Sequence, residues 1–303
     1  MNRWVEASRP RTLPLALASI LLGNILAYSS GSFSFLIALL AIITTVFLQI
    51  LSNYANDFGD TKNGIDTKDR KVALRTVQTG KISSKEMKNA IIALSVISFI
   101  SGIVLLYFSL KDSSPEVWLF FLGLGLLCIL AAITYTIGKR PYGYMGLGDI
   151  SVFIFFGWVG TLGTYFLQTK NIDWNVLLPA SACGFLSVAV LNLNNLRDIE
   201  NDIKNGKNSI PVRIGKKNGF FYQQALYIAA ILGFGLYPII TGQEFSNVQN
   251  FALLVGYYPL IKISRSLKPT MNPKEIDPFL KKTSLSTLWL ILIFGVVKIF
   301  LSH

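Results

Sequence analysis

The sequence contains almost no histidine and little cysteine, and these shortages exclude several kinds of chemistry. The only histidine among the 303 residues is His303, which argues against His-centred catalysis, haem ligation and the common transition-metal sites. The two cysteines, Cys128 and Cys183, both fall in strongly apolar stretches, where neither a disulfide framework nor a zinc site is expected. Any chemistry must therefore use Asp, Asn, Lys, Arg and Tyr side chains.

Charged residues are also scarce, at 15% of the chain, whereas 52% of residues are hydrophobic and the mean hydropathy is +0.50. A soluble chain of this length would not need so much apolar surface, so we expect the surplus to face lipid. The runs long enough to cross a bilayer lie near residues 13–29, 33–56, 89–110, 116–137, 147–168, 174–196, 219–241, 248–264 and 284–302. We therefore predict an all-α polytopic membrane protein, with nine transmembrane helices bundled around a central cavity as a single domain over residues 1–303.

The basic residues indicate how these helices are oriented. All of the 28 Lys and Arg residues except Lys111, Lys170 and Lys298 fall in segments that share one side of the membrane, the side of the N-terminus. Because Lys and Arg accumulate in cytoplasmic loops, we predict a cytoplasmic N-terminus and an external C-terminus in a cell inner or plasma membrane. These loops also account for the net charge of +12, so nucleic acid is not expected as a partner. The sequence indicates no obligate protein partner.

Two acidic clusters follow apolar runs on this cytoplasmic side: NYANDFGDTKNGIDTKDR at residues 53–70 and NNLRDIEND at residues 194–202. Helical spacing places an Asn and two Asp of each cluster nearly on one face: Asn53, Asp57 and Asp60 in the first, and Asn194, Asp198 and Asp202, with Asn195 beside them, in the second. Carboxylates grouped with amides are the hard oxygen ligands that Mg²⁺ prefers. A single cluster could equally be a solvated loop, but two with matching spacing favour Mg²⁺ ions that bridge a diphosphate.

Basic and aromatic residues accompany both clusters, and a third cytoplasmic loop, ITYTIGKRPYGYMGLGD at residues 133–149, adds more. Arg and Lys donate charge-assisted hydrogen bonds to phosphate oxygens, although positive-inside bias or interfacial anchoring explains many such residues. The candidates for substrate binding are Arg11, Asp66, Arg70, Arg75, Tyr135, Lys139, Arg140 and Asp149. We expect loops near 57–88, 138–146 and 197–218 to cap the cavity, with a short helix in each of the two long ones, and interpret residues 267–278 as a plain connector.

Together these motifs resemble the UbiA-type intramembrane prenyltransferases. The resemblance is carried by ASRPRTLPLALA (residues 7–18), the first acidic cluster with LRTVQTG (74–80), YTIGKRPYGYMGLGDISVFIFFG (135–157) and NNLRDIENDIKNGKNSIPVRIG (194–215). Within the family, the chain is most similar to the branch that prenylates 1,4-dihydroxy-2-naphthoate in menaquinone synthesis. Nine helices and a cytoplasmic N-terminus agree with this resemblance.

The resemblance implies that two Asp-rich motifs bind Mg²⁺, the expected cofactor, and an isoprenyl diphosphate at a site that opens toward the cytoplasm. The implied metal ligands are Asn53, Asp57, Asp60, Asn195, Asp198 and Asp202, of which the four aspartates are also the implied catalytic residues. The implied reaction transfers a polyprenyl group from polyprenyl diphosphate to 1,4-dihydroxy-2-naphthoate, with loss of CO₂ and diphosphate.

Two other functions remain open from the sequence. A UbiA-type enzyme could use another acceptor, such as 4-hydroxybenzoate, homogentisate or haem. An ion-coupled membrane transporter would also place acidic residues in membrane helices, although it favours the bilayer midplane. The acidic residues gather here at one side, in the company of basic residues, which favours the enzyme.

Overall fold

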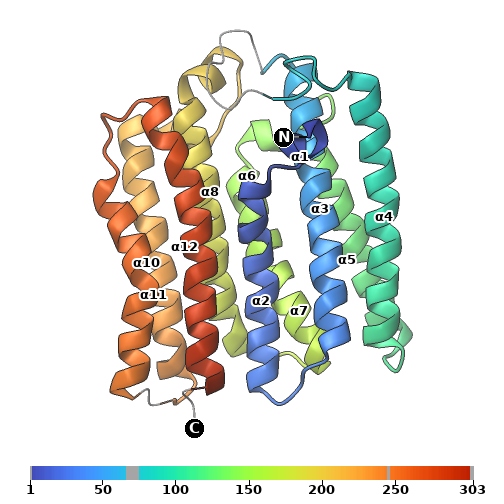
Figure 1. Cartoon of the computed structure of the whole chain (residues 1–303), viewed down its shortest axis with the longest axis vertical. Coiled ribbons are helices and arrows are strands. Elements are labelled where there is room, and N and C mark those ends of the chain that lie inside the picture. Colours follow the sequence, from blue (N-terminus) through green and yellow to red (C-terminus); the bar gives the residue numbers. More distant parts are fainter. Residues whose placement is uncertain (1, 66–74, 244–245, 301–303) are drawn as a thin grey trace.

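The computed structural model describes residues 2–65, 75–243 and 246–300, and within these ranges it is a bundle of helices with no strand (Figure 1). Eight segments of this described part are long and apolar enough to cross a membrane. They are Arg3–Ser29, α3 (Phe35–Lys62), α4 (Ser84–Leu110), α5 (Pro115–Thr134), Gly148–Thr169, Trp174–Lys204, α10 (Lys216–Ile240) and α12 (Pro273–Phe300). The predicted helical membrane architecture is thus confirmed.

Each of the nine predicted runs corresponds to a helix, but the eighth run is not among these eight segments. It forms α11 (Asn247–Ser266), which packs along α12 and carries polar residues at both ends. The start of the chain at α1 (Arg3–Ser8) and the end of α12 lie toward opposite ends of the bundle (Figure 1). An odd number of crossings would produce this arrangement, so the nine-span topology stays a prediction that the fold agrees with.

Several of the spans are interrupted or extended by short elements. The first consists of α1, the 3₁₀ turn η1 (Pro10–Thr12) and α2 (Leu13–Ser29). The fifth consists of α6 (Gly148–Val152), the π-helical segment η3 (Phe153–Val159) and α7 (Gly160–Thr169), where the sequence predicts one continuous helix. The sixth begins with η4 (Trp174–Val176) and continues as α8 (Leu177–Lys204). The loops add η2 (Tyr142–Met145) and α9 (Ile210–Ile214).

The π-helical segment packs closely against α8. A Cβ at Gly157 would lie 2.9 Å from the carbonyl oxygen of Ala180 and 2.9 Å from the Cα of Gly184. Only glycine allows this approach, and π-helical turns often occur at functional sites. The segment therefore brings Phe155, Phe156 and Val159 to the wall of the cavity described below.

The bundle is packed unevenly. Its main core lies where α8 packs against α10 and α12, around large buried side chains such as Tyr227, Phe234 and Phe294. By contrast, α5 contains no buried residue; it packs against α3 and α4, and its Phe121 stacks on Phe166 of α7. An internal space remains in the bundle beside α2 and α7, which pack against each other.

Candidate functional site

A cavity of about 390 Å³ lies among α2, α3, α4, α5, η3, α7 and α8. On α3 its lining residues follow one face from Asp60 through Asn56, Asn53 and Gln49 down to Ala41. Asp60 and Ala41 are 19 positions apart in the helix, which corresponds to roughly 29 Å at about 1.5 Å per residue, close to the hydrocarbon thickness of a bilayer. The lining is polar near Asp60 and mainly apolar farther along, where α4, α5 and α7 contribute Leu, Ile, Phe and Gly.

Among the described residues of the first cluster, Asp60 is the acidic residue that faces the cavity. The residue is 4% exposed, and its carboxylate forms an ion pair with Arg75, with 2.5 Å between Oδ2 and Nη2. The hydroxyl of Tyr144 donates a hydrogen bond of 2.6 Å to Oδ1. Burial, followed by the neighbouring Asp60 carboxylate, raises the pKa of Tyr144 above its ordinary value, so this hydroxyl remains a donor at neutral pH.

Asp57, three residues earlier, has a different environment. Its carboxylate accepts hydrogen bonds from the backbone N–H of Thr76 (3.0 Å), the Thr76 hydroxyl (2.6 Å) and the backbone N–H of Val77 (3.1 Å). Asp57 is 1% exposed and is not among the residues that line the cavity. It therefore fixes the turn at residues 75–80, and this turn carries Arg75 to the site.

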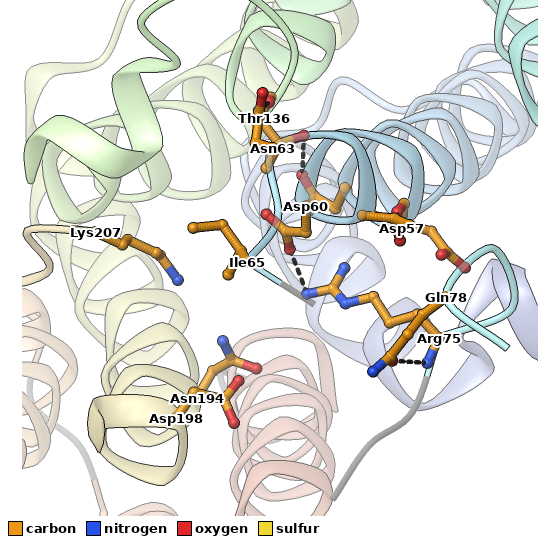
Figure 2. A network of polar contacts seen from close by, with 12 residues as sticks. Asp57, Asp60, Asn63, Ile65, Arg75, Gln78, Thr136, Asn194, Asp198 and Lys207 are labelled. Atoms are coloured by element: carbon orange, nitrogen blue, oxygen red, sulfur yellow. Dashed lines mark hydrogen bonds and ion pairs between the residues drawn. The ribbon is translucent and has the colours of Figure 1, made fainter. Parts of the chain in front are cut away.

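Gly59 explains how a second loop reaches the site. A Cβ at this position would lie 2.5 Å from the Thr136 hydroxyl and 2.7 Å from its carbonyl oxygen. The side chain of Asn63 donates to the same carbonyl oxygen at 2.8 Å (Figure 2). The glycine within NDFGD thus lets the chain after α5 lie directly on α3, which places Tyr135 and Tyr144 at the cavity.

The second acidic cluster approaches from α8. Figure 2 shows Asn194 and Asp198 facing the Asp60–Arg75 pair, with Lys207 on the same side. Between them in sequence, Arg197 is 3% exposed and bridges both side chains. It donates to the two carboxylate oxygens of Asp198 at 2.8 and 2.7 Å and to the amide oxygen of Asn194 at 2.8 Å.

The polar end of the cavity is strongly cationic. Its basic lining residues are Arg9, Arg11, Arg75, Lys207 and Lys281, whereas Asp60 is the one acidic residue among the described lining residues. Arg9 adopts a left-handed backbone conformation, with φ of 48°, between α1 and η1. An excess of cations beside oxygen donors suits a polyanion such as a diphosphate better than a bare cation.

The structure brings together part of the predicted site. Among the predicted residues, Arg11, Asn53, Asp60, Arg75 and Tyr135 line the cavity. In the second cluster, Asn194 lines it instead of Asn195, which is buried elsewhere. One residue along an α-helix corresponds to a rotation of roughly 100°, so neighbouring asparagines cannot both face the same space.

Other predicted residues lie away from the cavity. Asp202 is buried and lies 3.2 Å from the Nζ of Lys207, so it holds this lysine in place. Lys139 and Arg140 are exposed and are not lining residues. Asp149 accepts a hydrogen bond of 3.0 Å from Tyr222 of α10, also outside the lining. Asp66 and Arg70 lie outside the described residues.

Some residues of the site were not predicted, although the sequence contained a pattern that pointed to them. Tyr144 lies in the glycine- and tyrosine-rich third loop, and Arg197 lies inside NNLRDIEND itself. Arg9 and Lys207 could not be distinguished from ordinary positive-inside residues. For Asp277, which contacts Arg197 from α12, no local pattern gave a signal.

The polar end of the cavity offers oxygen donors of the kind that Mg²⁺ prefers. Within the described residues, no three His, Cys, Asp or Glu side chains gather as a ready-made metal cluster. The oxygen donors at the polar end are Asn53, Asn56, Asp60, Asn194 and, beside them, Asp198. Mg²⁺ is usually held by one or two carboxylates together with substrate phosphates and water. The residues therefore fit an ion that is bound together with a diphosphate.

Comparison with known proteins decides the family. The sequence profile of the UbiA prenyltransferase family matches residues 16–291. The chain belongs to this family. Its fold agrees with a UbiA homolog from Aeropyrum pernix, with a TM-score of 0.67 at 19% identity over 93% of this chain and 96% of that one. A UbiA homolog from Archaeoglobus fulgidus bound to DMAPP and Mg²⁺ gives a TM-score of 0.58 at 17% identity, covering 97% and 100%.

Two curated relatives are much closer in sequence. The 1,4-dihydroxy-2-naphthoate octaprenyltransferase of Haemophilus influenzae is 44% identical over 299 residues, which cover 97% of this chain and 95% of the relative. The enzyme of the same name from Escherichia coli is 44% identical over 300 residues, covering 99% and 96%. The similarity thus extends over nearly the whole length of all three chains.

Proposed function

We propose that this chain transfers a polyprenyl group from a polyprenyl diphosphate to 1,4-dihydroxy-2-naphthoate, giving demethylmenaquinol, CO₂ and diphosphate in menaquinone synthesis. The observation that carries the proposal is one cavity that joins a cationic, oxygen-rich end to a long apolar channel. A polyprenyl diphosphate has the same two parts in the same order. The 44% identity to two naphthoate octaprenyltransferases supports the acceptor and favours an octaprenyl donor.

The diphosphate is bound at the polar end. Arg75, Lys207 and Arg11 donate charge-assisted hydrogen bonds to its oxygens. Asp60, Asn194 and Asp198 would hold Mg²⁺, which when bound would neutralise charge on the departing diphosphate. Tyr144 keeps Asp60 oriented through its donated hydrogen bond.

The prenyl tail lies in the channel along α3. Leu48, Thr45 and Ala41 give its α3 wall, and α5 and η3 close it on other sides. The apolar wall makes burial of each methylene of the tail favourable by about 0.8 kcal/mol. It also excludes water from the allylic carbon, which protects a carbocation from hydrolysis.

The reaction balances without any further reactant. The allylic C–O bond breaks, and its electron pair leaves with the diphosphate. The naphthoate carbon that bears the carboxylate then attacks the allylic cation and forms the new C–C bond. The bond to the carboxylate breaks next, and its electron pair restores aromaticity as CO₂ departs. The ring of Tyr135 at the cavity wall is placed to stabilise the cation by a π contact.

The proposed setting is a cell membrane, with the polar end of the cavity toward the cytoplasm and the product released into the bilayer. The test uses purified protein in nanodiscs with Mg²⁺ and octaprenyl diphosphate, and offers 1,4-dihydroxy-2-naphthoate and 4-hydroxybenzoate in parallel. A decarboxylated prenyl product from the naphthoate alone, lost on addition of EDTA, supports the proposal. Product from the benzoate alone would leave the assignment as a prenyltransferase intact but would show that the naphthoate is not the acceptor.

A further inference from the structure

Asp277 lies near the start of α12, in a segment that the sequence suggested was a plain connector. The structure shows instead that its carboxylate contacts two arginines from distant parts of the chain. Oδ1 accepts a hydrogen bond of 2.6 Å from Nη1 of Arg197 on α8, and Oδ2 lies 3.5 Å from Nη1 of Arg11 in η1. Asp277 thus joins three elements at the polar end of the cavity.

The contact matters because of what Arg197 does with its other donors. A guanidinium has five N–H groups in one plane, and four hydrogen bonds use them here: two to Asp198, one to Asn194 and one to Asp277. The Arg197 side chain is only 1% exposed, whereas that of Asp277 is 27% exposed. Asp277 therefore holds the guanidinium of Arg197 through Nη1, and the remaining N–H groups of the same guanidinium hold Asn194 and Asp198.

The charge of Arg197 gives a second reason why the contact with Asp277 affects the site. Arg197 pairs with two carboxylates, Asp198 and Asp277, so neither carboxylate neutralises it alone. Without the Asp277 charge, the buried guanidinium would attract Asp198 more strongly and hold that carboxylate more tightly. A carboxylate tied to a buried cation is a weaker ligand for Mg²⁺, because binding must first displace the ion pair.

We propose that Asp277 is a positioning residue of the diphosphate site. It shares the charge of Arg197, and it thereby leaves Asp198 and Asn194 oriented for an Mg²⁺–diphosphate complex while it keeps Arg11 at the cavity wall. Residues that orient metal ligands in this way typically change metal affinity by about 10- to 100-fold when they are replaced. The inference rests on the proposed function in one respect: the bound anion is taken to be a diphosphate.

The test measures Mg²⁺-dependent binding without turnover. The unfolding temperature of the wild-type protein and of Asp277→Asn is followed during an MgCl₂ titration at fixed inorganic diphosphate. We expect the half-saturating Mg²⁺ concentration to rise about tenfold in Asp277→Asn, and Asp277→Glu, which keeps the charge, to recover most of the affinity. Asp277→Ser replaces Asp277→Asn if the latter does not accumulate as folded protein.

Glu275→Gln provides the matched control, because it removes one negative charge from the same helical turn. Its carboxylate accepts from the backbone N–H of Asn272 and contacts neither arginine. We expect it to bind Mg²⁺ and diphosphate as the wild type does. An Asp277→Asn protein that saturates at the wild-type Mg²⁺ concentration, even if it unfolds at a lower temperature, would reduce Asp277 to a structural role and overturn the proposal. Because no acceptor is present, this result is independent of whether the naphthoate is the substrate.

Discussion

At the scale of single residues, Asp57 and Asp60 show how two similar aspartates acquire different roles. Asp57 accepts three hydrogen bonds from the turn at residues 75–80. Asp60 faces the cavity, where it meets Arg75 and Tyr144. The first aspartate thus holds the loop, and the second is the one that we propose as an Mg²⁺ ligand.

Asp57→Asn should therefore lower stability as well as activity. The new amide NH₂ group would face a backbone N–H that now donates to a carboxylate, at a cost of about 1–3 kcal/mol for the unsatisfied buried donor. We expect a lower unfolding temperature in detergent than for Asp112→Asn, a control at a side chain that is 90% exposed. Unchanged unfolding with abolished turnover would instead indicate that Asp57 is a direct ligand.

Tyr144→Phe should reduce turnover with little effect on folding. The hydrogen bond of 2.6 Å to Asp60 is lost, so the carboxylate is held less firmly, and we expect kcat/KM to fall about tenfold by analogy with other supporting contacts of metal ligands. Tyr107→Phe, at an exposed tyrosine of α4, is the control. Equal kcat/KM values for the two variants would show that Tyr144 does not support Asp60.

The individual site residues could be predicted only in part. Both acidic clusters were recognisable because carboxylates beside apolar runs are rare and costly. The cavity is lined by Asn194 and not by Asn195, which the resemblance implied as a ligand; the two differ by a rotation of roughly 100° that spacing alone does not fix. Asp277 was missed because its partners, Arg11 and Arg197, are far away in sequence.

At the scale of helices, each apolar run predicted one helix, because lipid demands about 20 apolar residues for each crossing. Several helices extend beyond their runs: α12 begins at Pro273, whereas its run begins near residue 284. The runs could not predict the π-helical segment η3, which depends on the close contact of Gly157 with α8. Of the predicted capping helices, α9 lies in the second long loop. In the first loop, the described residues 75–80 form turns, and residues 66–74 lie outside the description.

Three glycines on different helices offer a direct test of the tail channel. Gly102, Gly125 and Gly163 all line the cavity, and a Cβ at each would meet no atom within 4 Å. A larger side chain there should fill the channel without disturbing the backbone. We expect Gly125→Leu to lower the use of octaprenyl diphosphate about tenfold relative to geranylgeranyl diphosphate.

Gly123 provides the control for this experiment because it lies on the same helix, has the same open surroundings and does not line the cavity. Gly123→Leu should gain the same helix propensity as Gly125→Leu and keep the wild-type preference. The measurement is the mass distribution of products from an equimolar mixture of the two donors. A wild-type distribution from Gly125→Leu would place the tail elsewhere.

At the scale of the whole molecule, the distribution of basic residues predicts the orientation, and the fold places α1 and the end of α12 toward opposite ends of the bundle (Figure 1). Fusions to the C-terminus test this prediction. A C-terminal alkaline phosphatase should be active and a C-terminal green fluorescent protein dark, because the C-terminus is expected outside the cytoplasm. The reverse pattern would place the C-terminus in the cytoplasm and, because α1 and the end of α12 lie toward opposite ends of the bundle, would invert the predicted orientation.

The most direct test of the account follows the carboxylate of the acceptor. Purified protein with Mg²⁺ and octaprenyl diphosphate is given 1,4-dihydroxy-2-naphthoate labelled at the carboxyl carbon, and labelled CO₂ and prenylated product are measured together. We expect one labelled CO₂ for each product molecule and no label in the product, because carbon–carbon bond formation and decarboxylation occur at the same ring carbon. Product that retains the label, or CO₂ released without prenylation, would contradict the account.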